Sequence, residues 1–115
     1  MTWMPSTPRD AANILDAAVE AYVRFDSAFQ YTLVNRAAEQ LLGKGRGDLL
    51  GKVLWEVYPE LIGTAFEGNY RRAMAERVPV KFEEYYEPWQ RRYAITVTPD
   101  SEHGIVVRAM DITDH

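Results

Sequence analysis

Apolar and polar positions alternate through the last third of the chain, and this pattern predicts three consecutive β-strands. The predicted strands are residues 80–86, 92–98 and 105–112. Two polar, proline-containing stretches, 87–90 and 99–104, separate them as turns. The last strand carries apolar residues on both faces, so we expect neither face of the sheet to be fully solvated there.

Two shorter strands are predicted near the beginning of the chain. Residues 21–26 alternate between apolar and polar, and residues 29–34 are rich in β-forming side chains. The short segment 26–28 would form the hairpin turn between them. Asn35 then follows as a helix N-cap, and the helix is expected to end at Gly43, because glycine suits the left-handed conformation of a helix terminus.

Helical segments are predicted between the two groups of strands. Residues 48–50 and 53–57 fit single helical turns, and a longer helix should run from Thr64 to about Arg77. Thr64 and Glu67 have the spacing of a capping box at its start. Two strands, a group of helices and three further strands predict an α+β domain, in which an antiparallel sheet carries helices on one face.

A further helix is predicted at the N-terminus. Thr7 can cap it, and Pro8 fits its first position. Its apolar residues recur at helical spacing and are Ala11, Ile14, Leu15 and Ala18. We expect this stripe to pack on the outer face of the sheet or on a second copy of the chain. The chain would then consist of a tail with a capping helix, residues 1–18, and a main domain, residues 19–114.

Composition narrows the class of protein. The 115 residues suffice for one domain. The chain has no cysteine, and neither of its two histidines has a second ligand nearby in the sequence, which argues against disulfides, a thiol nucleophile and a metal site. A net charge of −4 without a basic face argues against nucleic acid binding. No apolar run reaches the roughly 20 residues that span a bilayer, and no signal-peptide pattern is present, so we expect a cytoplasmic location.

No group of residues indicates catalysis. Glu83, Glu84 and Glu87 form a carboxylate cluster, but neighbouring residues of a strand point to opposite faces, so the first two cannot share one site. The serines lie in tail or turn segments without a histidine partner, which leaves no nucleophilic triad. The glycine-rich segment 43–47 follows a helix and lacks the ending of a phosphate loop. We therefore expect that the domain is not an enzyme.

Several short motifs in order resemble the PAS family of sensory domains. They are Asn35-Arg36-Ala37-Ala38-Glu39, Leu49-Leu50-Gly51-Lys52, residues 54–60, residues 79–86 and the closing Asp111-Ile112-Thr113. The resemblance covers residues 18–114 and depends on the motifs occurring together. It implies a five-stranded antiparallel sheet in the order 2-1-5-4-3, with helices enclosing a pocket against its inner face. PAS domains sense small molecules, redox state or light, or dimerise, and they pass the result to a kinase, cyclase or regulator.

The resemblance also bears on cofactors. Flavin-type light sensors of this family and the small yellow photoreceptor attach their chromophores through a cysteine, which this chain lacks. Haem-binding members commonly ligate iron through a histidine on the long helix, and residues 64–78 contain none. We therefore expect no cofactor, although the sequence leaves noncovalently bound flavin open.

The binding hypothesis places a small, mostly apolar ligand between the sheet and the helix of residues 64–77. The residues expected to form the wall are Tyr31, Leu33, Trp55, Phe66, Tyr70, Ala73, Met74, Tyr93, Ile95 and Val107. Aromatic walls with a few hydroxyl groups suit a ligand that carries one or two polar groups. The alternative is that these side chains only fill the core and leave no cavity.

Signal output is expected at the end of the last strand. By resemblance, Asp111 and Thr113 would anchor the linker to a covalently attached effector domain, such as a sensor kinase or cyclase. The alternative is a ligand-free dimerisation or protein-interaction module. It would form a homodimer through the N-terminal helix and an outer-face patch made of Tyr22, Val106, Met110 and Ile112.

Overall fold

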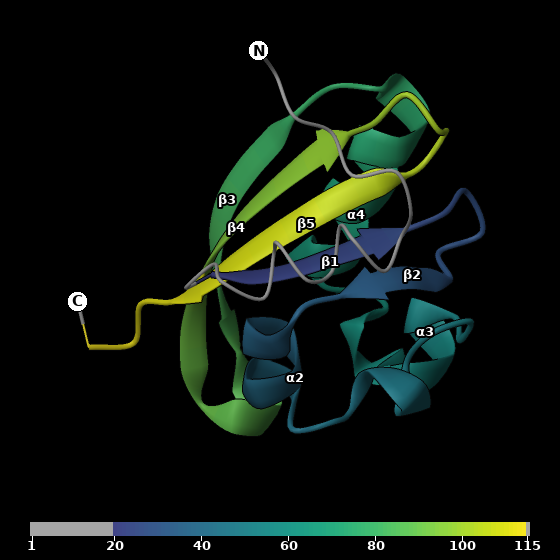
Figure 1. Cartoon of the computed structure of the whole chain (residues 1–115). Helices are drawn as coiled ribbons and strands as arrows, with labels where there is room; N and C mark the ends of the chain where they lie inside the picture. Colours follow the sequence, from purple (N-terminus) through teal and green to yellow (C-terminus); the bar gives the residue numbers. More distant parts are fainter. Residues whose placement is uncertain (1–19, 115) are drawn as a thin grey trace, which may run out of the picture.

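The computed structural model describes residues 20–114, which contain one five-stranded antiparallel sheet in the order β2-β1-β5-β4-β3 (Figure 1). The strands are β1 (Ala21–Phe25), β2 (Tyr31–Val34), β3 (Val80–Tyr86), β4 (Arg91–Pro99) and β5 (Ile105–Asp111). The predicted fold class and strand order are therefore confirmed. The predicted N-terminal helix lies outside the described residues.

A row of five valines crosses the inner face of the sheet, one from each of these strands. The register aligns them in the order Val34, Val23, Val107, Val97 and Val80. All but Val23 are buried, and Val23 packs against the core. Branched side chains pack well on a pleated surface, and a slip of one residue would turn a valine to the other face. The row therefore helps to fix the register of all five strands.

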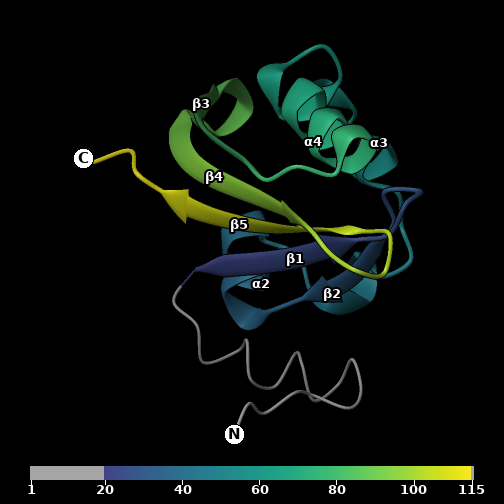
Figure 2. The same ribbon diagram turned by 90° about the horizontal axis from the view of Figure 1, so that it is seen from above.

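Within residues 20–114, three α-helices surround the space against the inner face: α2 (Arg36–Leu42), α3 (Leu54–Val57) and α4 (Ala65–Glu76). Short 3-10 turns lie in the connections and are η1 (Arg46–Asp48), η2 (Pro59–Leu61) and η3 (Glu87–Trp89). Figure 2 shows α3 and α4 on one side of the sheet. α4 turns its buried residues, Phe66, Tyr70 and Ala73, inward, as predicted from their helical spacing.

The helix α2 begins and ends as the sequence predicts. The Asn35 side-chain oxygen accepts a hydrogen bond from the Ala38 N–H at 2.9 Å, and Gly43 closes the helix with a φ of 67°. Asn35 is fully buried, and its side chain also accepts from the Tyr22 N–H and donates to the Glu20 carbonyl. One side chain therefore joins the start of α2 to β1.

The start of α4 differs from the predicted capping box. Thr64 is the N-cap residue, but its hydroxyl donates to the Leu61 carbonyl at the end of η2. Glu67 accepts a hydrogen bond from the Gly63 N–H, one residue before the partner that a capping box requires. The preceding turn supplies a competing acceptor, which sequence spacing alone does not reveal.

The turn between β1 and β2 is longer than predicted. The Asp26 carboxylate accepts hydrogen bonds from the N–H groups of Ala28 and Gln30. Phe29 has a φ of 60°, in the left-handed region. A residue in that conformation does not continue a strand, so β2 begins at Tyr31 and not at Phe29.

A β-bulge in β2 changes which of its side chains face the helices. The register pairs Phe25 with Tyr31 but Arg24 with Leu33, so Thr32 is an extra residue in β2. An extra residue reverses the alternation of the side chains that follow it. Leu33 therefore lies on the outer face beside Arg24, contrary to its predicted place in the pocket.

Candidate ligand-binding cavity

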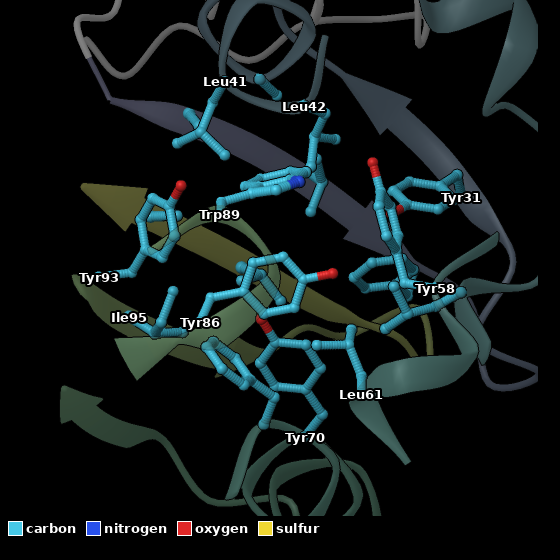
Figure 3. A pocket seen from close by; sticks show the side chains of 18 residues that line it. Tyr31, Leu41, Leu42, Tyr58, Leu61, Tyr70, Tyr86, Trp89, Tyr93 and Ile95 are labelled. Atoms are coloured by element: carbon cyan, nitrogen blue, oxygen red, sulfur yellow. The ribbon is translucent and has the colours of Figure 1, made fainter. Parts of the chain in front are cut away.

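A largely apolar cavity of about 100 Å³ lies between the inner face of the sheet and the surrounding helices (Figure 3). Side chains from all five strands form the sheet side of the cavity, while α2, α3, η2, α4 and η3 supply the opposite side. Among the described residues, no charged side chain lines it. The fold therefore leaves a small, partly open hollow at the inner face of the sheet.

Six of the residues predicted to form the pocket line this cavity. They are Tyr31, Phe66, Tyr70, Tyr93, Ile95 and Val107. Strand alternation brings Tyr93 and Ile95 to the inner face, and Phe66 and Tyr70 lie about one helical turn apart on α4. Whether these residues bind a ligand stays a prediction.

Trp55, predicted as a pocket residue, packs elsewhere. Its ring lies 5.1 Å from that of Phe29, measured between centroids, and 4.7 Å from the guanidinium carbon of Arg71. Its neighbour Leu54 is buried and lines the cavity instead. Because α3 is a single turn, the sequence pattern does not show which of the two residues faces inward.

Leu33, Met74 and Ala73 are also absent from the cavity lining. The bulge places Leu33 on the outer face, as described above. Met74 is partly buried at the flank of α4, where its sulfur lies 3.6 Å from a guanidinium nitrogen of Arg77. Ala73 is fully buried and belongs to the packed core.

The cavity has further lining residues that the sequence analysis did not assign to it. They are Ala21, Val23, Phe25, Ala38, Leu41, Leu42, Leu54, Tyr58, Leu61, Tyr86, Trp89 and Ala109. For seven of the twelve, the sequence carries a detectable signal. Three lie on the inward face of β1, three lie on the apolar stripe of α2, and Ala109 follows from the alternation of β5. Trp89 carries no such signal, since it lies in a turn where periodicity gives no direction.

Trp89 is in contact with both the cavity and a neighbouring open groove. Its ring lies 4.9 Å from that of Tyr86 and 6.1 Å from that of Tyr58, in edge-to-face geometry. The groove has a volume of about 610 Å³, is also lined by Trp89, and extends to Arg91 and Asp111. The cavity therefore lies next to a surface hollow at the end of the sheet where β5 terminates.

Tyrosine hydroxyls provide the polar groups around the cavity. Tyr86 donates a hydrogen bond to the Glu60 carboxylate. The Tyr58 hydroxyl is buried without a partner in the part of the chain that the structure describes. Burial, with a smaller contribution from Glu60, raises the pKa of Tyr58 to about 12. Burial also raises the pKa of Tyr31 and Tyr70 above its ordinary value, so all these phenols are protonated at neutral pH.

The two predicted relay residues form a hydrogen-bonded turn at the end of β5. The N–H and hydroxyl of Thr113 both donate to the Asp111 carboxylate, and these bonds hold the pKa of Asp111 below its ordinary value. The Arg92 N–H donates to the Thr113 hydroxyl oxygen at 3.0 Å. Arg91 lies 3.6 Å from the Asp111 carboxylate. This exit turn, Asp111 to Thr113, is therefore held against β4.

The size and lining of the cavity limit its chemistry. Its volume is smaller than the roughly 150 Å³ of an engineered cavity that holds benzene, so the three fused rings of a flavin would require the walls to move. Within residues 20–114, no group of side chains is placed to hold a metal ion.

None of the described helices is both long and apolar enough to span a membrane.

Comparison with known proteins gives a family and several relatives. A family model described as the PAS fold matches residues 15–115. The nitrogen regulation protein NtrY of Azorhizobium caulinodans is 31% identical over 105 residues, which make up 88% of this chain but 13% of that protein. The chain therefore spans a small part of its curated relative.

Several solved structures share the fold. The PAS domain of Bordetella pertussis BvgS has a TM-score of 0.73 at 23% identity, covering 93% of this chain and 87% of that one. A sensory box sensor histidine kinase from Vibrio cholerae has a TM-score of 0.71 at 17% identity, with coverages of 91% and 90%. The PAS domain of the nitrogen regulation protein NR(II) from Vibrio parahaemolyticus has a TM-score of 0.62 at 15% identity, with coverages of 89% and 97%. At these identities the likeness concerns the fold.

Proposed function

Because this chain belongs to the PAS fold family, we propose that it is the sensory domain of a larger signalling protein of the two-component type. Its similarity to a nitrogen regulation protein over most of its length supports this proposal. The effector would be a covalently linked domain, such as a histidine kinase. The domain itself would not be catalytic, and its location would be cytoplasmic, as the sequence predicts.

The proposed signal is a small, mostly apolar ligand bound in the cavity. The observation that carries this proposal is the partly open cavity itself, since most of its lining is apolar and tyrosine hydroxyls border it. Protein interiors normally pack with few voids larger than a water molecule, so a hollow of this kind is a candidate binding site. Neither flavin nor haem is part of the proposal, because the cavity is small and the long helix lacks a histidine.

The proposed output is a change in the exit turn. Val107 lines the cavity and belongs to β5, which leads directly to Asp111 and Thr113. The exit turn is held by few bonds to β4, so a small displacement of β5 would alter them. A ligand shifts this equilibrium only if its affinity differs between the two arrangements of the exit turn.

A ligand-free dimerisation module is the second candidate. Met110 lies on the outer face of β5 and is 44% exposed, which favours a partner on that face. The N-terminal helix of the same chain or of a second copy would cover it. The two functions are compatible within one signalling protein.

Native mass spectrometry of the purified chain, repeated after denaturation, tests the proposed binding. We expect a stoichiometric additional mass that is lost on denaturation. The variant Ala109→Leu, which adds bulk where the cavity meets the groove, should reduce this mass. The matched control is Ala94→Leu on the opposite face of the sheet, which should retain it.

Hydrogen exchange of the exit turn tests the proposed output. Ligand saturation should change the protection of the Ile112 and Thr113 amides, whose hydrogen bonds reach Arg92 and Asp111. A chain that carries no additional mass, and that is dimeric in solution, would instead support the dimerisation module. Unchanged exchange with bound ligand would refute the relay through β5.

A further inference from the structure

One buried tyrosine hydroxyl at the cavity, that of Tyr58, has no hydrogen-bond partner within residues 20–114. Two further tyrosines with buried side chains, Tyr31 on β2 and Tyr70 on α4, line the same cavity. The great majority of buried polar groups in proteins are hydrogen-bonded, and each exception needs a physical reason. The exception at Tyr58 is explained if its partner occupies the cavity, where Tyr31 and Tyr70 supply two further hydroxyls.

A fourth tyrosine of the cavity shows the contrast. Tyr86 donates its hydroxyl proton to the Glu60 carboxylate, so its hydrogen-bonding capacity is used within the protein. Glu60 lies close enough to Tyr58 to raise its pKa, but within the described residues the Tyr58 hydroxyl forms no hydrogen bond. Burial, with smaller contributions from Tyr58, Tyr70 and Tyr86, raises the pKa of Tyr31. Figure 3 shows these side chains entering the same space from different elements.

The protonation state of the three hydroxyls decides what they can bind. Burial raises the pKa of each phenol, so each keeps its proton at neutral pH and can donate a hydrogen bond. No charged side chain lines the cavity to balance a ligand charge. Burial of an unpaired charge is costly, so the cavity disfavours ionised ligands.

We propose that the cavity binds a compact, uncharged molecule with a carbonyl-type acceptor, and that the hydroxyls of Tyr31, Tyr58 and Tyr70 recognise that acceptor. This inference rests on the proposed function and adds the chemical class of the ligand. A volume of about 100 Å³ limits the buried part to about one small ring. The apolar walls hold the ring, and the hydroxyls select the acceptor.

Two probe molecules of nearly equal shape distinguish binding by apolar packing from binding by a hydrogen bond to the acceptor. Cyclopentanone carries a carbonyl oxygen, and methylenecyclopentane carries a methylene group in its place. Their dissociation constants are measured by NMR titration with the unmodified chain and with the variants Tyr31→Phe, Tyr58→Phe and Tyr70→Phe. Each variant removes one hydroxyl and keeps the ring that packs in the core.

We expect at least one of these variants to weaken cyclopentanone binding about fivefold, the effect of losing a neutral hydrogen bond. Binding of methylenecyclopentane should be unchanged or tighter in the same variant. Tyr85→Phe is the matched control, because Tyr85 lies on the exposed face of β3 and is 41% exposed, and it should affect neither probe.

The outcomes distinguish this inference from the proposed function. If both probes bind and every variant changes their dissociation constants equally, the hydroxyls do not recognise the acceptor and the inference is overturned. The proposed ligand-binding cavity would still stand. If neither probe binds and the purified chain carries no additional mass, both proposals fail. Ordered water filling the cavity, detected by NMR and not displaced by cyclopentanone, would also overturn the inference.

Discussion

Gly104, in the turn before β5, has no room for a side chain. A Cβ atom at this position would collide with the Phe25 carbonyl oxygen and would lie 2.5 Å from a guanidinium nitrogen of Arg24. We expect Gly104→Ala to lower the free energy of unfolding by about 2 kcal/mol, because the backbone must move to relieve the overlap. Urea denaturation measures this change.

Gly68 provides the control for that substitution. It lies on the exposed side of α4, and a Cβ atom there would meet nothing within 4 Å. Gly68→Ala should raise the free energy of unfolding by about 0.5–1 kcal/mol, since alanine is the better helix former. If the two alanine variants had the same effect, the close approach at Gly104 would not be what selects glycine.

Asn35 joins α2 to β1 through a buried side chain. Replacement by alanine removes the acceptor for the Tyr22 and Ala38 N–H groups and the donor to the Glu20 carbonyl. We expect Asn35→Ala to lower the free energy of unfolding by about 2–4 kcal/mol, because it removes a helix cap and leaves buried backbone groups unpaired. Asn69→Ala on the exposed surface of α4 is the control, and chemical denaturation should show a change of no more than about 0.5 kcal/mol.

At the scale of the element, the bulge in β2 predicts that Val34 is more sensitive to substitution than Leu33, whereas strict alternation would predict the opposite order. Val34 lies on the inner face and is 1% exposed, whereas Leu33 lies on the outer face. Val34→Thr should lower the free energy of unfolding by about 2 kcal/mol, because it buries a hydroxyl among apolar side chains. Leu33→Thr should cost less than about 1 kcal/mol. Thermal unfolding of both variants checks the order, and a larger loss at Leu33 would show that the bulge is misplaced.

The same bulge shows where sequence reasoning stops. Long alternating strands such as β4 could be predicted with the correct inward residues, because period two fixes the face once one residue is placed. Thr32 gives no sequence signal that it is an extra residue, so the face of Leu33 could not be predicted. The wrong face predicted for Leu33 affects one wall of the pocket but not the predicted strand order.

Short elements limit the prediction of the cavity for a related reason. Phe66 and Tyr70 lie on a twelve-residue helix whose apolar stripe is readable, and both line the cavity. Met74 follows Ala73 by one residue, which places it about 100° further round the helix and at the edge of that stripe. In α3, with four residues, packing against neighbouring elements decides between Leu54 and Trp55.

At the scale of the whole molecule, the turn between β4 and β5 connects parts that are distant in sequence. The Asp100 carboxylate accepts hydrogen bonds from Arg24 on β1 and from the Gly104 N–H. Arg77, directly after α4, donates to the carbonyls of Asp100 and Gly104. A single turn therefore links the middle of the sheet to the end of the long helix.

Because the Asp100 carboxylate takes part in this connection, the free energy of unfolding should depend on pH in the acid range. Partial burial alone would raise the pKa of Asp100, but its hydrogen bonds with Arg24 and with backbone N–H groups outweigh burial and hold the pKa below 3.8. A lowered carboxyl pKa adds stability above about pH 4, and this contribution is lost as the pH falls through the folded-state value. We expect the free energy of unfolding to decrease below about pH 4, measured by urea denaturation at several pH values.

Asp100→Asn is the control for the acid dependence. The amide cannot titrate, so the variant should be less stable at neutral pH, and its stability should fall less steeply between about pH 4 and pH 2. Parallel acid profiles for the two proteins would assign the acid sensitivity to other carboxylates, such as the exposed Asp111.

The position of Trp89 gives the domain an optical consequence. Indole fluorescence responds to the polarity of its surroundings, and this ring borders both the cavity and the groove. The chain has two other tryptophans, Trp3 and Trp55, and Trp55 does not line the cavity. With phenylalanine at positions 3 and 55, the emission of the one remaining indole would report whether the cavity of the purified protein is filled, without an added dye.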